Sequence, residues 1–217
     1  MFYTILSLLI VSFFLFSAFI VVSIYNYRGR FKLEYHLRSH FPYELNYHGK
    51  YKDNIYGNII FALYFIAAEV YLVLAAGHDD GYLIFALIAG SITLISLGAL
   101  IYIPIDHLRL HMMIVALAFI FSLAFSFAIV LASYFKYKEL NSVSALVSLI
   151  FSVVVTALYA IMILNPKLSH WADMDTETNE DGTVKQVRPK WFVLAYSEWA
   201  MMILYLFSLV SLFIERI

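Results

Sequence analysis

The sequence predicts an all-α integral membrane protein with six transmembrane helices. Of its 217 residues, 63% are hydrophobic and 13% are charged, and the mean hydropathy is +0.84. Soluble domains carry about 25% charged residues, so a surface this apolar requires lipid around it. The chain has no cysteine, which excludes disulfides, thiolate metal ligands and a catalytic thiol. A net charge of −1 gives no indication of nucleic-acid binding.

Six apolar runs are long enough to cross the bilayer core, which takes about 20 helical residues. They cover residues 2–25, 59–76, 82–103, 112–134, 144–164 and 191–214. Strands of a membrane barrel alternate over about 10 residues, and these runs are longer and uniformly apolar. The first run has no basic segment before it and exceeds the roughly 7–15 apolar residues of a secretory signal, so we expect it to be retained. We expect residues 1–217 to form a single domain.

The segments between the runs carry residues typical of helix ends. Aromatic and cationic side chains follow the first run at residues 25–30 and the fourth at residues 134–138, as expected at a headgroup boundary. Residues 77–81 predict a short turn after the second run. Pro104 is expected to end or kink the third span, because proline has no backbone N–H to donate, and Pro166 follows the fifth.

Two of the loops carry strand-like patterns. Residues 30–38 of the first loop alternate polar and apolar side chains, and residues 43–47 repeat the pattern, which is typical of half-buried strands. In the fifth loop, residues 173–178 and 183–187 flank an Asp-Gly turn at residues 179–182, and such a turn predicts a hairpin. We therefore expect a small β cap built from loops one and five. An irregular loop in the headgroup layer is the alternative for loop one.

Positive charge predicts the orientation in the membrane. Six spans place both termini on one side and loops one, three and five on the other. Of the chain's 14 lysines and arginines, only Lys136, Lys138 and Arg216 fall on the terminal side. Short cytoplasmic loops are enriched in these residues, so we expect cytoplasmic odd loops in a plasma or bacterial inner membrane.

Two glutamates interrupt the apolar runs. Glu69 lies well inside the second run, and Glu198 lies seven residues into the last. Burying an ionisable group in a membrane costs at least about 2.5 kcal/mol, which makes each glutamate a candidate functional residue. Three interpretations remain open. The carboxyls could be protonated structural groups bonded across helices, binding groups for a lipid headgroup or substrate, or a proton relay.

A polar segment, residues 104–111, separates two long runs that contain no charged side chain. His107 and His111 are four residues apart at the start of the fourth span, a spacing that places two side chains on one helix face. They could bind zinc, with Asp106 as a third ligand. The alternatives are a polar helix entry capped by Asp106, and headgroup recognition by Arg109 together with the histidines.

Several residues together resemble a known family. They are Gly98, Pro104, Asp106 and His111 in the middle of the chain, Glu198 and Trp199 at the start of the last span, and the HFPY segment at residues 40–43. In this arrangement the chain resembles the Frag1/DRAM/Sfk1 family of six-span membrane proteins and its bacterial relatives. The resemblance implies a role in membrane-lipid handling, and it carries over Pro104, Asp106, His111, Glu198 and Trp199.

The chain departs from this family at two points. The serine- or threonine-rich turn that usually continues the first-loop motif is absent after Tyr43. The family's first loop faces the lumen or exterior, whereas the charges here predict the cytoplasm. The resemblance and the charge bias therefore predict opposite orientations.

Our leading hypothesis from the sequence is a lipid-binding or lipid-handling membrane protein with a polar pocket on the odd-loop side. The predicted pocket residues are Asp106, His107, Arg109, His111, Glu198, Trp199 and Glu69. One alternative is an intramembrane lipid hydrolase that holds zinc through His107 and His111. The other is a proton-coupled transporter that uses the two intramembrane glutamates, although no inverted repeat or paired broken helix is evident. Membrane lipids are the expected partners, and a homo-oligomer remains open.

Overall fold

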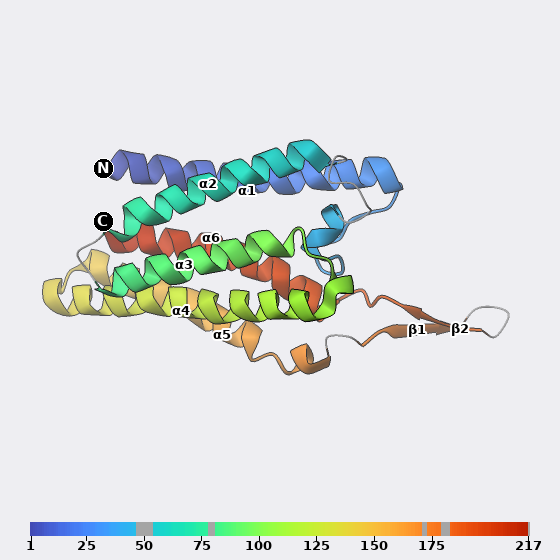
Figure 1. The fold of residues 1–217 in the computed structure, drawn as a ribbon. Helices are drawn as coiled ribbons and strands as arrows, with labels where there is room; N and C mark the ends of the chain where they lie inside the picture. The colour runs from blue at the N-terminus through green and yellow to red at the C-terminus, as the bar shows by residue number, and fades with distance from the viewer. Residues whose placement is uncertain (47–53, 78–80, 171–172, 179–182, 217) are drawn as a thin grey trace.

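The computed structural model describes residues 1–46, 54–77, 81–170, 173–178 and 183–216. Within them, six helices are long and apolar enough to cross a membrane, which confirms the predicted fold class. These helices are α1 (Phe2–Phe31), α2 (Ile55–Ala76), α3 (Gly81–Leu100), α4 (Leu108–Leu140), α5 (Val143–Ile163) and α6 (Val193–Arg216). The two chain ends lie at one end of the bundle, and the segments after α1, α3 and α5 lie at the other (Figure 1).

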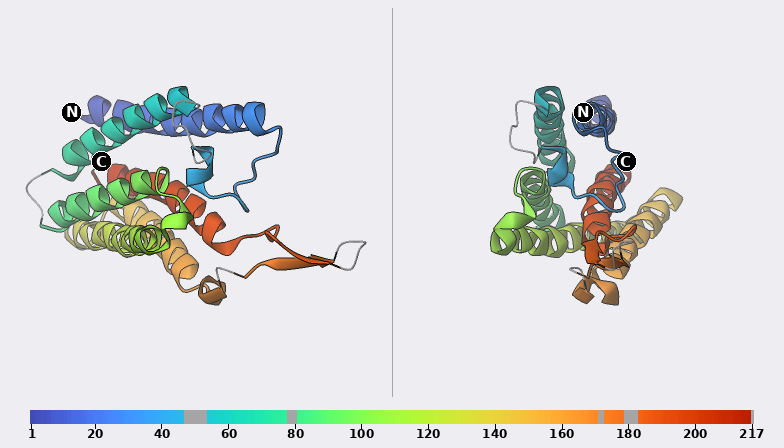
Figure 2. Two further views of the ribbon diagram at one scale, coloured as in Figure 1. Left: turned by 45° about the vertical axis from the view of Figure 1, so that its right-hand side comes forward. Right: turned by 90° about the vertical axis from the view of Figure 1, so that its right-hand side faces the viewer.

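The six helices pack in three layers. α1 and α2 lie side by side along one side of the bundle, α4 and α5 along the opposite side, and α3 and α6 between them (Figures 1 and 2). α6 contacts each of the other five helices. Its buried small residues include Ala195, Ser197, Ser208 and Ser211, which let neighbouring helices approach closely. Ser208 and Ser211 donate to carbonyls four residues earlier, so burying these hydroxyls leaves no unsatisfied group.

Left-handed residues end two of the longest helices. Lys32 follows α1 with φ of 57°, and its N–H donates to the Arg28 carbonyl. Asn141 follows α4 with φ of 44° and donates to the Tyr137 carbonyl. Both arrangements satisfy carbonyls that a helix end leaves free. α3 ends at Leu100, shortly before Pro104, as the sequence predicts.

The predicted strands of loop one are wrong. α1 continues to Phe31, and residues 33–46, which we call the cap segment, contain the 3-10 helix η1 (Pro42–Leu45) instead of a strand. Residue 47 of the predicted second strand lies outside the described residues. Of the apolar side chains in residues 30–38, Tyr35 is buried against the bundle, whereas Leu33 is 60% exposed. Phe41, which lies between the two predicted strands, is also buried. Pro42 cannot donate to a strand ladder, but it suits the first turn of a helix.

Hydrogen bonds between the cap segment and the bundle hold the segment in place. Arg30 donates to the Leu45 carbonyl at 3.0 Å, and Asn46 donates to the Ile101 carbonyl at 3.3 Å. Within the segment, the Tyr35 hydroxyl donates to the Phe41 carbonyl at 2.7 Å. These bonds satisfy backbone carbonyls that no sheet pairs, as buried carbonyls require.

The hairpin predicted in loop five is confirmed, but it does not form part of a cap. β1 (Asp175–Thr178) pairs antiparallel with β2 (Val184–Val187). The predicted turn at residues 179–182 lies outside the described residues. Every residue of β1 is exposed, and the hairpin extends away from the bundle (Figure 1). The predicted cap of strands from both loops is therefore wrong, and the cap segment covers this end of the bundle without a strand.

The orientation remains a prediction that introduced thiols can test, because the chain has no cysteine of its own. Thr176 is exposed in the hairpin, and Glu139 is exposed at the opposite end of α4. We expect a membrane-impermeant maleimide to label Glu139→Cys in intact cells or spheroplasts and to label Thr176→Cys only after permeabilisation. The reverse labelling pattern would contradict cytoplasmic odd loops.

Candidate functional site

The structure brings together two of the residues predicted from the sequence, His111 and Glu198. His111 lies in the first turn of α4, and Glu198 lies in the second turn of α6. His111 Nε2 is 2.9 Å from Glu198 Oε1, and both side chains are fully buried, with 0% exposure. The two residues are 87 positions apart in the sequence, and their contact joins α4 to α6.

The second ring nitrogen of His111 limits this pair to two arrangements of the shared proton. Nδ1 lies 2.8 Å from the Ile103 carbonyl, and a carbonyl oxygen only accepts, so Nδ1 carries a hydrogen. Nε2 then either accepts from a protonated Glu198 or, in an imidazolium, donates to its carboxylate. In both states a single proton lies between the two side chains. The other carboxyl oxygen, Oε2 of Glu198, is buried without a hydrogen-bond partner among the described residues.

Aromatic side chains of the cap segment seal this pair from the end of the bundle. The rings of Phe41 and Tyr43 lie edge-on to the His111 ring, with centroid distances of 6.0 and 5.7 Å. Trp199 of α6 donates from Nε1 to the His40 carbonyl at 3.0 Å. At His111 and Glu198, where the sequence predicts part of a polar pocket, the structure therefore has a closed contact between helices that aromatic rings cover.

A second buried carboxylate fastens the base of the hairpin to the cap segment. Glu44 is paired with Arg188, with oxygen–nitrogen distances of 2.8 and 3.0 Å. Arg188 also donates to the Ser39 carbonyl at 3.1 Å. Burial lowers the pKa of Arg188, but the hydrogen bond and charge of Glu44 outweigh it and raise the pKa above its usual value. The guanidinium therefore stays charged and anchors both loops.

The other residues predicted in the polar segment lie at the surface. Asp106, His107 and Arg109 are all exposed. His107 belongs to the 3-10 helix η3 (Ile105–His107), which precedes α4, so the helical spacing that would place it beside His111 does not apply. No group of three histidine, aspartate or glutamate side chains suited to a metal occurs among the described residues.

Glu69 lies apart from the His111–Glu198 pair. Its Oε1 accepts from the Ser91 hydroxyl of α3 at 2.6 Å, and its Oε2 is buried without a hydrogen-bond partner in the described part of the chain. Glu69 and Glu198 each bond to a different helix, α3 and α4. This arrangement corresponds to the structural interpretation, in which each carboxyl is satisfied by its own neighbour.

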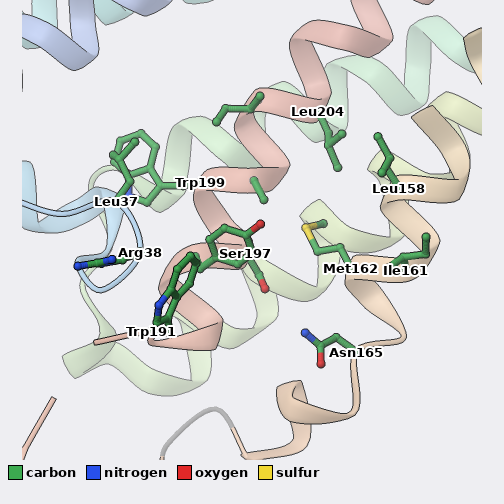
Figure 3. A pocket seen from close by; sticks show the side chains of 13 residues that line it. Leu37, Arg38, Leu158, Ile161, Met162, Asn165, Trp191, Ser197, Trp199 and Leu204 are labelled. Atoms are coloured by element: carbon green, nitrogen blue, oxygen red, sulfur yellow. The ribbon is translucent and has the colours of Figure 1, made fainter. Parts of the chain in front are cut away.

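A groove of about 590 Å³ lies on another face of α6, between α5 and α6 (Figure 3). Trp199 lines it, as do Leu158, Ile161 and Met162 of α5 and Ile203 and Leu204 of α6. Polar side chains line one end of the groove: Arg38 from the cap segment, Asn165 after α5, and Ser197. We call this hollow the α5–α6 groove.

Sequence reasoning missed most residues of this groove. No pattern in the sequence distinguishes Arg38 from the other basic residues of loop one, or marks Asn165 as a binding residue. Trp191 carried a weak signal, since tryptophan at the start of a span is typical of the membrane interface. In the structure, the Arg38 guanidinium lies 5.6 Å from the centre of the Trp191 ring. The contact joins loop one to the start of the last span, which no sequence pattern indicates.

Comparison of the chain with protein-family models, with curated proteins and with solved structures gave no match. Membership of the Frag1/DRAM/Sfk1 family therefore stays a prediction based on the residues quoted above. The function must be argued from the geometry of this chain alone.

Replacing Glu198 should distinguish a hydrogen bond from simple packing. Glu198→Ala leaves His111 Nε2 buried without a partner, and we expect a loss of about 1–3 kcal/mol in the free energy of unfolding. Glu198→Gln should stay closer to the unsubstituted protein, because its amide can donate to Nε2. Equilibrium unfolding in detergent micelles measures both. Equal losses in the two variants would contradict a stabilising hydrogen bond.

Removing Arg188 should loosen the cap segment. Arg188→Met leaves the buried carboxylate of Glu44 unpaired, and we expect a loss of about 1–3 kcal/mol in the free energy of unfolding. The matched control is Glu34→Gln, because the pair of Glu34 with His36 is exposed and such pairs contribute little. We expect faster proteolysis within residues 33–46 in Arg188→Met only. Unchanged proteolysis would show that the pair does not hold the segment.

Proposed function

We propose that this protein binds a membrane lipid in the α5–α6 groove. The observation that carries the proposal is the division of the groove into an apolar length and a polar end. Leu158, Ile161 and Ile203 line the apolar part and are themselves exposed on the outside of the bundle, Ile161 by 69%. In a spanning helix such exposed side chains face acyl chains, so the groove opens sideways to the bilayer.

The polar end of the groove lies at the level where lipid headgroups are found. Arg38 belongs to the loop after α1, Asn165 follows the end of α5, and Trp191 precedes the start of α6. All three therefore lie at helix ends, where arginine and tryptophan are typical of the membrane interface. An amphiphile with one polar head and an apolar chain fits this order of side chains.

The size of the groove also suits such a ligand. Ligand pockets usually measure about 300–1,000 Å³ and combine apolar walls with a few placed polar groups. The groove, at about 590 Å³, lies within that range. One or two acyl chains could lie along the apolar walls while the headgroup contacts Arg38.

The geometry supports binding more than the two alternatives. A hydrolase needs its acid–base residues to touch substrate and water, whereas His111 and Glu198 are both fully buried under aromatic rings. A relay between the two intramembrane glutamates needs a shared path. Each carboxyl instead bonds to a separate partner, Ser91 and His111 respectively.

A bulky side chain in the groove should displace the lipid. Ala200 lines the groove, and we expect Ala200→Trp to reduce the lipid that remains bound after mild detergent extraction by at least about tenfold, the effect of ~1.4 kcal/mol. Native mass spectrometry measures the bound fraction. The matched control is Ile150→Trp, which adds the same side chain at an exposed position of α5 outside the groove. Equal lipid retention in both variants would contradict the proposal.

A further inference from the structure

The polar end of the α5–α6 groove shares Arg38 with a second hollow. A basic cleft of about 460 Å³ is lined by His36, Arg38, Ser39, His40, Arg188 and Lys190, with Pro189. Arg38 lines both hollows. A headgroup held at the polar end of the groove would therefore extend into this cleft.

The charges in the basic cleft are only partly neutralised. Arg188 is paired with Glu44, and His36 lies 3.4 Å from Glu34. Burial lowers the pKa of His40, which keeps that ring uncharged at neutral pH. Two cations remain, Arg38 and Lys190.

Neither of these two cations forms an ion pair with a carboxylate among the described residues, and no acidic side chain lines the cleft. Two cations in one hollow, neither paired with a carboxylate in the described part of the chain, favour a ligand with net negative charge.

Arg38 is positioned to bind an anion. Its carbonyl accepts from the Phe192 N–H at 2.9 Å, which fixes the backbone at the start of α6. Its guanidinium lies over the Trp191 ring, which holds the plane while leaving its N–H groups able to donate. A guanidinium matches the oxygens of a phosphate in two parallel hydrogen bonds. On the opposite side of the polar end, Asn165 Oδ1 accepts from the Lys167 N–H, and its amide nitrogen donates to no residue that the structure describes.

We infer that the lipid bound in the α5–α6 groove is an anionic phospholipid, whose phosphate lies between Arg38 and Lys190. This inference rests on the proposed function and adds the class of headgroup. A zwitterionic phospholipid has the same phosphate, but it would also bring a cation into a cleft that already holds two. The cleft therefore discriminates by net charge and not by the phosphate alone.

A competition between two lipids tests the inference. The full-length protein is mixed in detergent with equal amounts of phosphatidylglycerol and phosphatidylcholine that carry the same acyl chains, and native mass spectrometry counts each adduct. We expect the unsubstituted protein to prefer phosphatidylglycerol by at least about tenfold. Arg38→Gln and Lys190→Gln should each reduce this preference while total lipid binding persists.

The control is Arg109→Gln, which removes an exposed cation from the same side of the protein but outside both hollows. Its preference should equal that of the unsubstituted protein. Excess inorganic phosphate should not displace phosphatidylglycerol, because the acyl chains contribute to binding; displacement would overturn the assignment to a lipid.

The outcomes separate the two proposals. Lipid that is retained without preference, or a preference that persists in both Arg38→Gln and Lys190→Gln, would overturn the anionic headgroup and leave lipid binding intact. Retention that Ala200→Trp does not change would instead overturn lipid binding in the groove itself.

Discussion

Glu198 is fully buried, so its carboxyl group can form hydrogen bonds only within the protein, and its partner is His111. The same imidazole bonds through its other nitrogen to the Ile103 carbonyl. One side chain therefore joins the turn after α3, the start of α4 and the start of α6. Leaving a buried polar group unpaired costs free energy. This contact therefore favours one axial position of α6 relative to α4, and with it the position of the groove along the other face of α6.

The cap segment closes the same end of the bundle, and its position depends on α6. Trp199 holds the His40 carbonyl, and Arg188 joins Ser39 and Glu44 to the base of the hairpin. These contacts bring Arg38 to the polar end of the groove. The buried polar residues thus stabilise the fold. The residues proposed to bind a lipid lie next to them, at the surface that faces the membrane and its interface.

How far the sequence predicts this protein depends on the range of each interaction. The six spans follow from composition over about 20 residues, because lipid leaves the backbone few alternatives to a helix. The fifth-loop hairpin follows from the local turn chemistry around Asp-Gly. The strand predicted from the alternation of residues 30–38 is wrong, because Tyr35 packs into the helix bundle and not against a neighbouring strand. The spacing of His107 and His111 predicts a shared helix face only when both residues lie in one helix, and His107 lies in η3, before α4.

The sequence by itself determined that this is a six-span membrane protein with costly carboxyls at Glu69 and Glu198, because hydropathy and the burial of charge are local properties. Only the tertiary structure decided that Glu198 bonds to His111, that Glu69 bonds to Ser91, and that Arg38 lies over Trp191. Each of these contacts joins segments from different helices or loops. Which segments meet depends on how six similar apolar helices pack, and packing among such helices is set by side-chain shape that no single apolar run reveals.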